Sequence, residues 1–177
     1  TDARYVRMQG VKRGLPYGYS LWEMEVYATV KETAEYGVVS KNKTATTSGT
    51  ETEAMAAANA FDGDEGTRWS SNFADDAWIS VDLGKTYAID KVVLNWEAAY
   101  GKAYKIQTST DGNNWTTLYR QTKGSGNKVD NVELYANARY VRMYGYTRVE
   151  NGSGFSINEL QVYEYKNGDK KVTHNIE

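Results

Sequence analysis

The stretch WISVDLG, Trp78–Gly84, alternates Trp, Ser and Asp with Ile, Val and Leu. Because successive side chains of a strand point to opposite faces, this alternation predicts a strand with one polar and one buried face. KVVLNW at Lys91–Trp96 is rich in β-branched residues, which favour strands. AYKIQTSTDGNNWTTLY at Ala103–Tyr119 predicts two strands joined by a hairpin turn at Asp111–Asn113. Strands are therefore the main element of this part of the chain.

Further segments extend the pattern to the end of the periodic part of the chain. They are VELY (Val132–Tyr135), RYVRMYGY (Arg139–Tyr146) and INELQVYEY (Ile157–Tyr165). Turn residues separate the strands at short intervals, as in an all-β sandwich. Only EAMAAANA, Glu53–Ala60, has the composition of a helix, of one or two turns. The sequence predicts an all-β sandwich with one short helix.

An internal repeat covers the end of the periodic part. ARYVRM at Ala3–Met8 returns unchanged at Ala138–Met143, and each copy is followed by a loop and a second apolar segment. With one residue inserted in the second loop, the aligned positions are Gly18 with Gly154, Ser20 with Ser156, Glu23 with Glu159, Val26 with Val162 and Tyr27 with Tyr163. We interpret residues 1–28 as the last hairpin of a preceding copy of the module in a tandem array.

The repeat sets the expected organisation of the rest of the chain. We interpret 29–35 as a linker, 36–165 as one complete module, and 166–177 as a tail or the start of the next linker. An unpaired apolar strand is prone to association, so residues 1–28 also raise the hypothesis of a dimer formed through this hairpin.

Composition argues against several classes of function. The formal net charge of the 177 residues is −2, and Lys and Arg are scattered, which argues against a nucleic-acid or anionic-membrane partner. The chain has no Cys, so thiol chemistry is excluded, and its single His is His174 in the tail. No nucleophile motif is present, so an enzyme is a weaker hypothesis than a binding module. The 15 Tyr and 5 Trp suit half-buried strands and contact surfaces.

One loop combines oxygen donors with glycine. NAFDGDEGTRW at Asn59–Trp69 holds Asp62, Asp64 and Thr67 beside glycines that allow carbonyl groups to turn inward. A hard cation such as Ca²⁺ takes about six to eight oxygens from carboxylates, hydroxyls and carbonyls. From the residues alone, a metal site and a surface turn with solvated acids both stay open.

Taken together, the motifs resemble the discoidin family, also called coagulation factor 5/8 type C domains. The resemblance rests on AANAFDGDEGTRWSSN, WISVDLGKTYAIDKVVLNWE, YKIQTSTDGNNWTTLY, ARYVRMYG and INELQVYEY, in this order within Tyr36–Tyr165. Within the family the chain is similar to family 32 carbohydrate-binding modules, and NWEAAYGKAYKIQ is similar to the modules of bacterial chitosanases and β-glucanases. The resemblance implies a jelly-roll β-sandwich, galactose-binding-domain-like, of about eight strands with Greek-key connections and no catalytic activity.

The resemblance also implies a structural Ca²⁺ in the acidic loop. Carried over by position, the side-chain ligands are Asp62, Thr67 and Glu159, and the backbone carbonyl ligands are those of Asn59, Asp64 and Asn158. Each of the three side-chain positions holds an oxygen donor. In this interpretation the ion fixes the loop to the last strand and takes no part in catalysis.

In the family the ligand binds on loops at one end of the sandwich. The candidate sugar contacts here are Glu51, Glu53, Arg68, Phe73, Glu97, Tyr100 and Phe155. Phe73 and Phe155 lie in loops where no core periodicity demands an aromatic ring, so we expect both to stack on the sugar. Tyr100 stays open between the core and the site.

Neighbouring residues at a strand end point to opposite faces, which separates Trp96 from Glu97. We expect Trp96 in the core and Glu97 at the loop end of the sandwich. Trp69 and Trp78 are also expected in the core, and Trp115 is interpreted as a packing residue.

The carboxylates favour an amino sugar. The ammonium of a glucosamine unit donates charge-assisted hydrogen bonds to carboxylates, and we assign this role to Glu97 and to Glu51 or Glu53. Arg68 orients Glu97 or contacts a hydroxyl. The expected function is a non-catalytic module that holds a parent glycoside hydrolase on chitosan or its oligosaccharides. The alternative ligands are β-1,3-glucan and terminal galactose or GlcNAc, and the alternative class is an adhesion or lipid-binding module.

Two further expectations accompany this interpretation. The parent protein is expected to be secreted by a bacterium, which the absence of Cys fits. Binding per module is expected to be weak, with avidity supplied by tandem copies. The preceding copy has Tyr19 where this module has Phe155, so the two copies are expected to bind differently.

Overall fold

A computed structural model of the chain describes residues 7–22, 24, 36–149 and 153–165. The chain divides into two compact units, Thr1–Thr33 and Ala34–Glu177, and each is described by itself. Among the described residues, no helix is long and apolar enough to cross a membrane.

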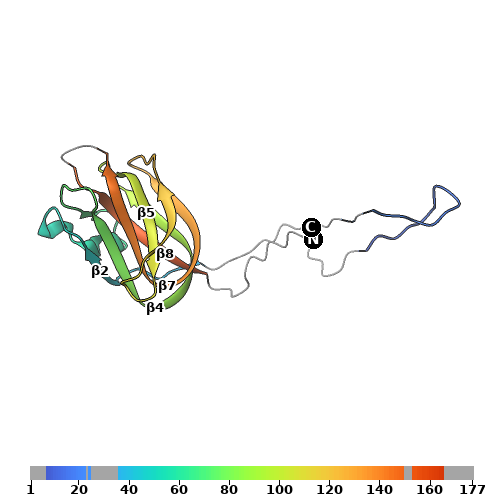
Figure 1. The fold of residues 1–177 in the computed structure, drawn as a ribbon, viewed down its shortest axis with the longest axis horizontal. Helices are drawn as coiled ribbons and strands as arrows, with labels where there is room; N and C mark the ends of the chain where they lie inside the picture. The colour runs from blue at the N-terminus through green and yellow to red at the C-terminus, as the bar shows by residue number, and fades with distance from the viewer. Residues whose placement is uncertain (1–6, 23, 25–35, 150–152, 166–177) are drawn as a thin grey trace. The chain divides into compact units, whose positions relative to one another are not determined.

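The second unit is built from antiparallel strands. Its elements are β1 (Tyr36–Val38), β2 (Thr44–Thr47), η1 (Glu53–Met55), η2 (Ala57–Phe61), β3 (Trp69–Ser70), β4 (Trp78–Trp96), β5 (Gly101–Ser109), β6 (Thr116–Gln121), β7 (Val129–Arg148) and β8 (Ser156–Tyr165). The strand order is β1-β8-β4-β7-β5-β6, with β2 paired to β4 and β3 paired to β8. Figure 1 shows the long strand β7 running between β4 and β5.

Two long strands, β4 and β7, carry the sheet round a corner. The pairing of β4 with β7 shifts register between Asp82 and Tyr87, around Gly84, which has a positive φ of 86°. The first part of β4 pairs with β2, and its second part pairs with β8. The last part of β7 pairs with β5. The sheet therefore folds over itself into a β-sandwich, which confirms the predicted fold class.

The core lies between the two layers. Along β4 the alternation seen in the sequence buries Ile79, Val81 and Leu83, each 0% exposed. Other large, fully buried side chains are those of Phe61, Trp69, Ile89, Leu94, Trp96, Tyr104, Ile106, Met143, Phe155 and Ile157. The predicted β5–β6 hairpin is present, and the Asp111 carboxylate accepts backbone N–H bonds from Asn113 and Asn114 at 2.9 and 2.8 Å.

One expectation about local structure is confirmed in place but differs in helix type, and another is wrong. The helix expected over Glu53–Ala60 is two short 3₁₀ helices, because Ala56 between them has extended backbone (φ −65°, ψ 156°). Trp78 is half-buried rather than in the core. It is the first residue of β4 and pairs across the strands with Tyr144, so its side chain lies on the opposite face of the strand from Ile79.

The first unit carries the upstream copy of the repeat. Its described residues, 7–22 and 24, contain no strand, so the expected hairpin is not seen there. The other residues of that expectation, 1–6, 23 and 25–28, lie outside the described part of the chain, as do 29–35 and 166–177. Within the unit a Cβ at Gly10 would overlap the Tyr19 ring, so this ring packs directly on the glycine backbone. The hypothesis of a dimer through these residues stays a prediction.

Candidate functional site: an acidic hollow beside an acidic loop

A hollow of about 180 Å³ opens where four segments of the sandwich meet. These segments are the β2–η1 loop, β3 with its flanks, the β4–β5 loop and the start of β8. The residues that line the hollow are Glu51, Arg68, Ser70, Phe73, Glu97, Ala99, Ser153, Gly154 and Ser156. Four of the seven sugar contacts expected from the sequence therefore lie together.

Glu51 is held against β3 by two hydrogen bonds. Its backbone N–H donates to the Ser70 carbonyl at 2.9 Å, and its carboxylate accepts from the Ser70 hydroxyl at 2.8 Å. The Ser70 hydroxyl also lies 2.9 Å from the hydroxyl of Ser156 on β8. Glu51 itself is exposed, so its carboxylate is fixed on the protein side and open on the solvent side.

Glu97 faces the hollow because it follows Trp96 at the end of β4. Trp96 is 1% exposed, as predicted, and its indole N–H donates to Asp130 at 3.1 Å. The Glu97 backbone N–H donates to the Ser156 carbonyl at 3.1 Å, and one Glu97 carboxylate oxygen accepts the Ala99 N–H at 2.8 Å. The carboxylate is therefore oriented by its own loop.

Arg68 supplies the positive group of the hollow. Its Nε is buried and has no hydrogen-bond partner among the described residues. Leaving a buried donor without a partner costs about 1–3 kcal/mol. Within the described residues Arg68 forms no ion pair with Glu51 or Glu97.

Phe73 and Phe155 differ in exposure to solvent. Phe73 is 56% exposed and lines the hollow, as expected of a stacking ring. Phe155 is 0% exposed, so the expectation that it stacks on a sugar is wrong. A Cβ at Gly145 would overlap the Phe155 ring, which means that the ring fills the space above that glycine. Two hydrogen bonds hold Phe155 in this place: its N–H donates to the Ser71 hydroxyl at 2.8 Å, and its carbonyl accepts the Ser71 N–H at 2.9 Å.

Two other expected contacts do not line the hollow. Glu53 is the exposed first residue of η1. Unlike Glu51, whose backbone bonds to Ser70, it does not line the hollow. Tyr100 is half-buried and packs against the core, and a Cβ at Gly126 would overlap its ring. As sugar contacts, the sequence did not single out Ser70, Ala99, Ser153, Gly154 or Ser156, although all but Ser156 lie in the loops expected to bind the sugar, Arg68–Phe73, Trp96–Tyr100 and the loop through Phe155. The repeat gave a signal for Gly154 and Ser156, since Gly18 and Ser20 occupy their positions in the upstream copy.

The acidic loop gathers oxygens around Thr67. The Thr67 hydroxyl lies 2.8 Å from the Asp62 carboxylate, 3.0 Å from the Asp64 carbonyl and 3.4 Å from the Asn59 carbonyl. From β8, Glu159 accepts the Gly63 N–H at 2.8 Å. Five of the six expected ligand residues therefore belong to one cluster.

The sixth expected ligand residue, Asn158, is next in sequence to Glu159, one of two residues here whose carboxyl pKa values are shifted. Asn158, half-buried, precedes Glu159 on β8. Burial and the neighbouring Asp62 carboxylate raise the pKa of Glu159. Burial opposes ionisation of Asp62, but hydrogen bonds from the Asp64 N–H and the Thr67 hydroxyl lower the pKa of Asp62 overall. Two carboxylates thus lie close together in a partly buried place.

The donor set of this loop fits a hard cation. In the described ranges no cluster of three or more His, Cys, Asp or Glu side chains is found, so a metal here would also need hydroxyl and carbonyl oxygens. Two carboxylates, a hydroxyl and backbone carbonyls are the oxygen donors that Ca²⁺ takes. Asp62, Thr67 and Glu159 would hold the ion with side chains, and Asn59, Asp64 and Asn158 with carbonyls. A bound cation would offset the repulsion between Asp62 and Glu159.

Comparison with known proteins places this architecture. The model of the F5/8 type C family, described as a NedA-like, galactose-binding domain, matches residues 59–143. Chitosan-binding module 1 of a chitosanase/glucanase from Paenibacillus sp. IK-5 is 42% identical, with a TM-score of 0.68, over 72% of this chain and 98% of the module. Module 2 of the same enzyme, solved with chitotriose, is 41% identical, with a TM-score of 0.68, over 71% of this chain and 98% of the module.

A curated relative is much longer than this chain. The polysaccharide lyase 8 family protein HylA of Enterococcus faecalis is 34% identical over 115 residues, which are 60% of this chain and 8% of that protein. The chain is thus homologous to binding modules of polysaccharide-cleaving enzymes. It belongs to the F5/8 type C family of NedA-like, galactose-binding domains.

Proposed function

We propose that the second unit is a non-catalytic carbohydrate-binding module for chitosan and its oligosaccharides. The observation that carries the proposal is the pair Glu51 and Glu97, two carboxylates that face one hollow with no cation paired to either among the described residues. A glucosamine ammonium donates three hydrogen bonds and carries the charge that such a pair favours.

The other lining groups serve the sugar ring. The exposed Phe73 ring offers a flat apolar face to the C–H side of a pyranose. The Arg68 guanidinium lines the hollow and carries N–H donors that suit a sugar hydroxyl. The identity of 41–42% to two modules that are named as chitosan-binding supports the same ligand.

We infer that the module serves a larger protein. The chain spans 8% of the length of the curated relative. Modules of this kind keep a polysaccharide-cleaving enzyme on its substrate, and a second copy upstream would add avidity. Since chitosan is a polymer met outside the cell, we place the parent protein there, as a secreted bacterial enzyme.

Calorimetric titration with chitotriose and with fully N-acetylated chitotriose tests the proposal. We expect saturable binding of chitotriose alone, because acetylation removes the ammonium. Affinity should fall as pH rises through the pKa of the glucosamine amine, since the uncharged amine no longer pairs with the carboxylates, and salt should weaken binding. Equal binding of both ligands at every pH would contradict the proposal.

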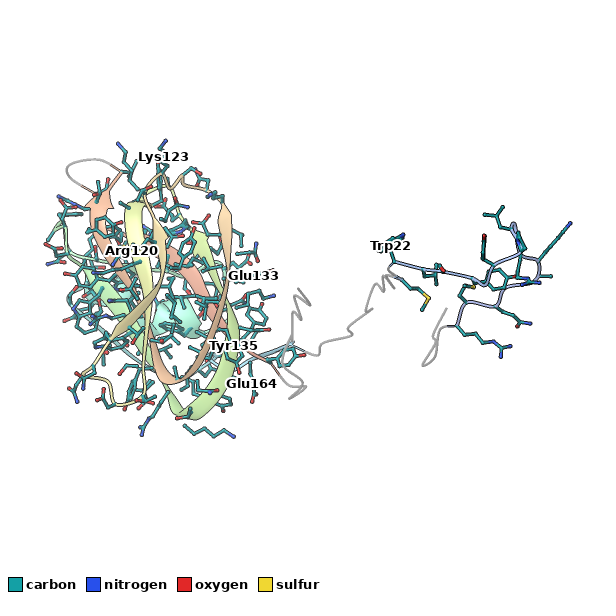
Figure 2. The ribbon with its side chains drawn as sticks, turned by 45° about the vertical axis from the view of Figure 1, so that its right-hand side comes forward. Trp22, Arg120, Lys123, Glu133, Tyr135 and Glu164 are labelled. Atoms are coloured by element: carbon teal, nitrogen blue, oxygen red, sulfur yellow. The ribbon has the colours of Figure 1, made fainter. Side chains whose placement is uncertain are left out.

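Substitutions separate the site from the rest of the surface. Glu97→Gln should lower the affinity for chitotriose by about tenfold to a hundredfold, the usual loss for one charged hydrogen bond. Glu133→Gln is the matched control, because Glu133 projects from β7 into solvent and does not line the hollow (Figure 2). Binding of laminaritriose with unchanged strength in Glu97→Gln would assign the hollow to a neutral β-1,3-glucan, for which Phe73 and Arg68 would supply the contacts.

The acidic loop is proposed to bind a structural Ca²⁺. A ligand at about 100 times its dissociation constant raises the free energy of unfolding by about 2.7 kcal/mol. Thermal unfolding with Ca²⁺, with Mg²⁺ and with EDTA should show this gain with Ca²⁺ alone. Asp62→Asn should abolish the gain, whereas Glu65→Gln, an exposed acid in the same loop, should keep it. The same melting temperature with Ca²⁺ and EDTA would contradict the proposal.

A further inference from the structure

Two buried hydroxyls lie behind the carboxylate of Glu51. Ser70 on β3 is 1% exposed and Ser156 on β8 is 2% exposed. The Ser70 Oγ lies 2.8 Å from the Glu51 carboxylate and 2.9 Å from the Ser156 Oγ. The three groups form a chain that leads from β8 through β3 to the hollow.

The chemistry of the groups fixes the direction of these bonds. An ionised carboxylate accepts hydrogen bonds and donates none, so the single Ser70 proton points at Glu51. The bond between the two serines therefore takes its proton from Ser156. A chain of hydroxyls that all point one way strengthens each of its bonds, above all in a buried place.

Ser156 also holds the loop that carries the second acid. Its backbone N–H donates to the Ala99 carbonyl at 2.7 Å, and its carbonyl accepts the Glu97 N–H at 3.1 Å. One residue thus contacts Glu51 through its side chain, by way of Ser70, and Glu97 through its backbone. Ser156 is therefore linked to both of the segments that carry the two carboxylates, through Ser70 in the case of Glu51.

We propose that Ser70 and Ser156 are positioning residues that fix the Glu51 carboxylate at the hollow that it shares with Glu97, and so set the preference for the amino sugar. The inference rests on the proposed function of the hollow. A purely structural pair of buried serines would affect stability alone. The upstream copy of the repeat has Ser20 at the position of Ser156, so it retains the hydroxyl.

A double-mutant cycle tests this role. Ser156→Ala and Ser70→Ala should each weaken chitotriose binding by about tenfold, the loss of roughly one hydrogen bond to a charged group, with circular dichroism and melting temperature showing a folded module. In a Glu51→Gln background the same two substitutions should change the affinity little, since the group that they orient is already neutral. Ser156→Thr, which keeps a hydroxyl, should restore binding. An equal loss in both backgrounds, or no loss in either, would overturn the proposal.

A measurement without ligand keeps the two proposals apart. Carbon-13 relaxation of the Glu51 side chain should show less order in Ser70→Ala and Ser156→Ala than in the unchanged protein, while the exposed Glu65 side chain should stay the same. This result in a protein that does not bind chitotriose would retain the positioning role and reject the proposed function. Unchanged order of Glu51 would reject the positioning role, whatever the ligand.

Discussion

The hexapeptide ARYVRM occurs twice in the chain, and its last two residues, which the structure describes in both copies, differ in their surroundings. In the second copy it lies within β7, and Met143 is 0% exposed. In the first copy Met8 is 49% exposed, and neither Arg7 nor Met8 belongs to a strand. Because the sequence is the same, the difference comes from the neighbours: β4 and β5 pair with β7 on its two sides. A segment with strand propensity therefore forms a strand only where neighbouring strands are available to pair with it.

The loops after the two copies show what the local sequence does by itself. Tyr19 packs on Gly10 in the first copy, and Phe155 packs on Gly145 in the second. Arg13 donates to the Pro16 carbonyl at 3.1 Å, and its counterpart Arg148 donates to the Ser153 carbonyl at 2.9 Å. A ring on a glycine and an arginine on a carbonyl therefore close the loop in both units. The two copies therefore differ in burial, whereas their loops are closed by the same kinds of contact.

The largest test of this comparison is the pair Met143→Ala and Met8→Ala. Removing a fully buried Met side chain leaves a cavity and should lower the free energy of unfolding by about 2–5 kcal/mol. Met8→Ala, at the same position of the same hexapeptide, should change it by less than about 0.5 kcal/mol. Urea unfolding followed by tryptophan fluorescence measures both. Similar losses for the two variants would mean that the first copy is buried in solution.

A second pair tests the glycines before the aromatic rings. A Cβ at Gly154 would overlap the Ser71 carbonyl, which is backbone and has little freedom to move, whereas a Cβ at Gly18 meets nothing within 4 Å. Gly154→Ala should therefore destabilise the module by about 1–3 kcal/mol, the usual cost of overpacking. Gly18→Ala should be nearly neutral in the same urea experiment. A neutral Gly154→Ala would mean that Gly154 and the Ser71 carbonyl lie farther apart in solution than in this structure.

Arginine at the fifth position of the hexapeptide gives a third, smaller contrast. The Arg142 guanidinium lies 4.1 Å from the centre of the Trp115 ring and donates to the Gln107 side chain at 2.8 Å. This contact makes Trp115 a packing residue, as expected. Arg142→Ala should cost about 1–2 kcal/mol from the lost cation–π contact and hydrogen bond. Arg7→Ala, at an exposed position, should cost nothing measurable. Loss of the stacked cation alone should leave the rest of the fold unchanged in circular dichroism. A changed spectrum in Arg142→Ala would instead indicate a wider rearrangement and contradict the prediction.

The same distinction explains which features of the site were predictable. Trp96 and Glu97 were assigned correctly, because alternation along one strand decides their faces. Phe73 and Phe155 were indistinguishable in sequence, since the burial of Phe155 depends on Gly145 in the neighbouring strand. Local signals determined the strands and the acidic loop; the lining of the hollow depended on contacts between distant segments.

The acidic side of the hollow is the part of the site that the sequence predicts least well. Glu51 and Glu53 were equivalent candidates, and Glu51 lines the hollow because its backbone and carboxylate both bond to Ser70. The Ser70–Ser156 contact joins residues 86 positions apart. Serine on a strand has no distinctive pattern, so sequence periodicity gives no warning of such a pair.

The smallest expected effect concerns Arg139, the second residue of the hexapeptide in its second copy. Its guanidinium binds the Asp82 carboxylate through two hydrogen bonds of 2.8 and 2.7 Å and lowers the pKa of Asp82. A carboxyl whose pKa is lowered on folding adds stability above its ordinary pKa of about 3.9, and this stability is lost as pH falls through the lowered value. The counterpart, Arg4, lies outside the described residues.

Asp82→Asn should therefore lower the free energy of unfolding by at most about 1 kcal/mol at pH 6, because both side chains are partly exposed to solvent. At lower pH the unchanged protein loses the same contribution, so the difference between the two proteins should shrink steadily towards zero as pH falls below about 4. Titrations of other carboxyls, in the acidic loop above all, occur in both proteins and cancel in the difference. A difference that stays constant down to the lowest pH would show that Asp82 acts by packing, or by accepting the Gly84 N–H with its side chain, rather than by its charge. The contrast between the two hexapeptides would then rest on burial alone.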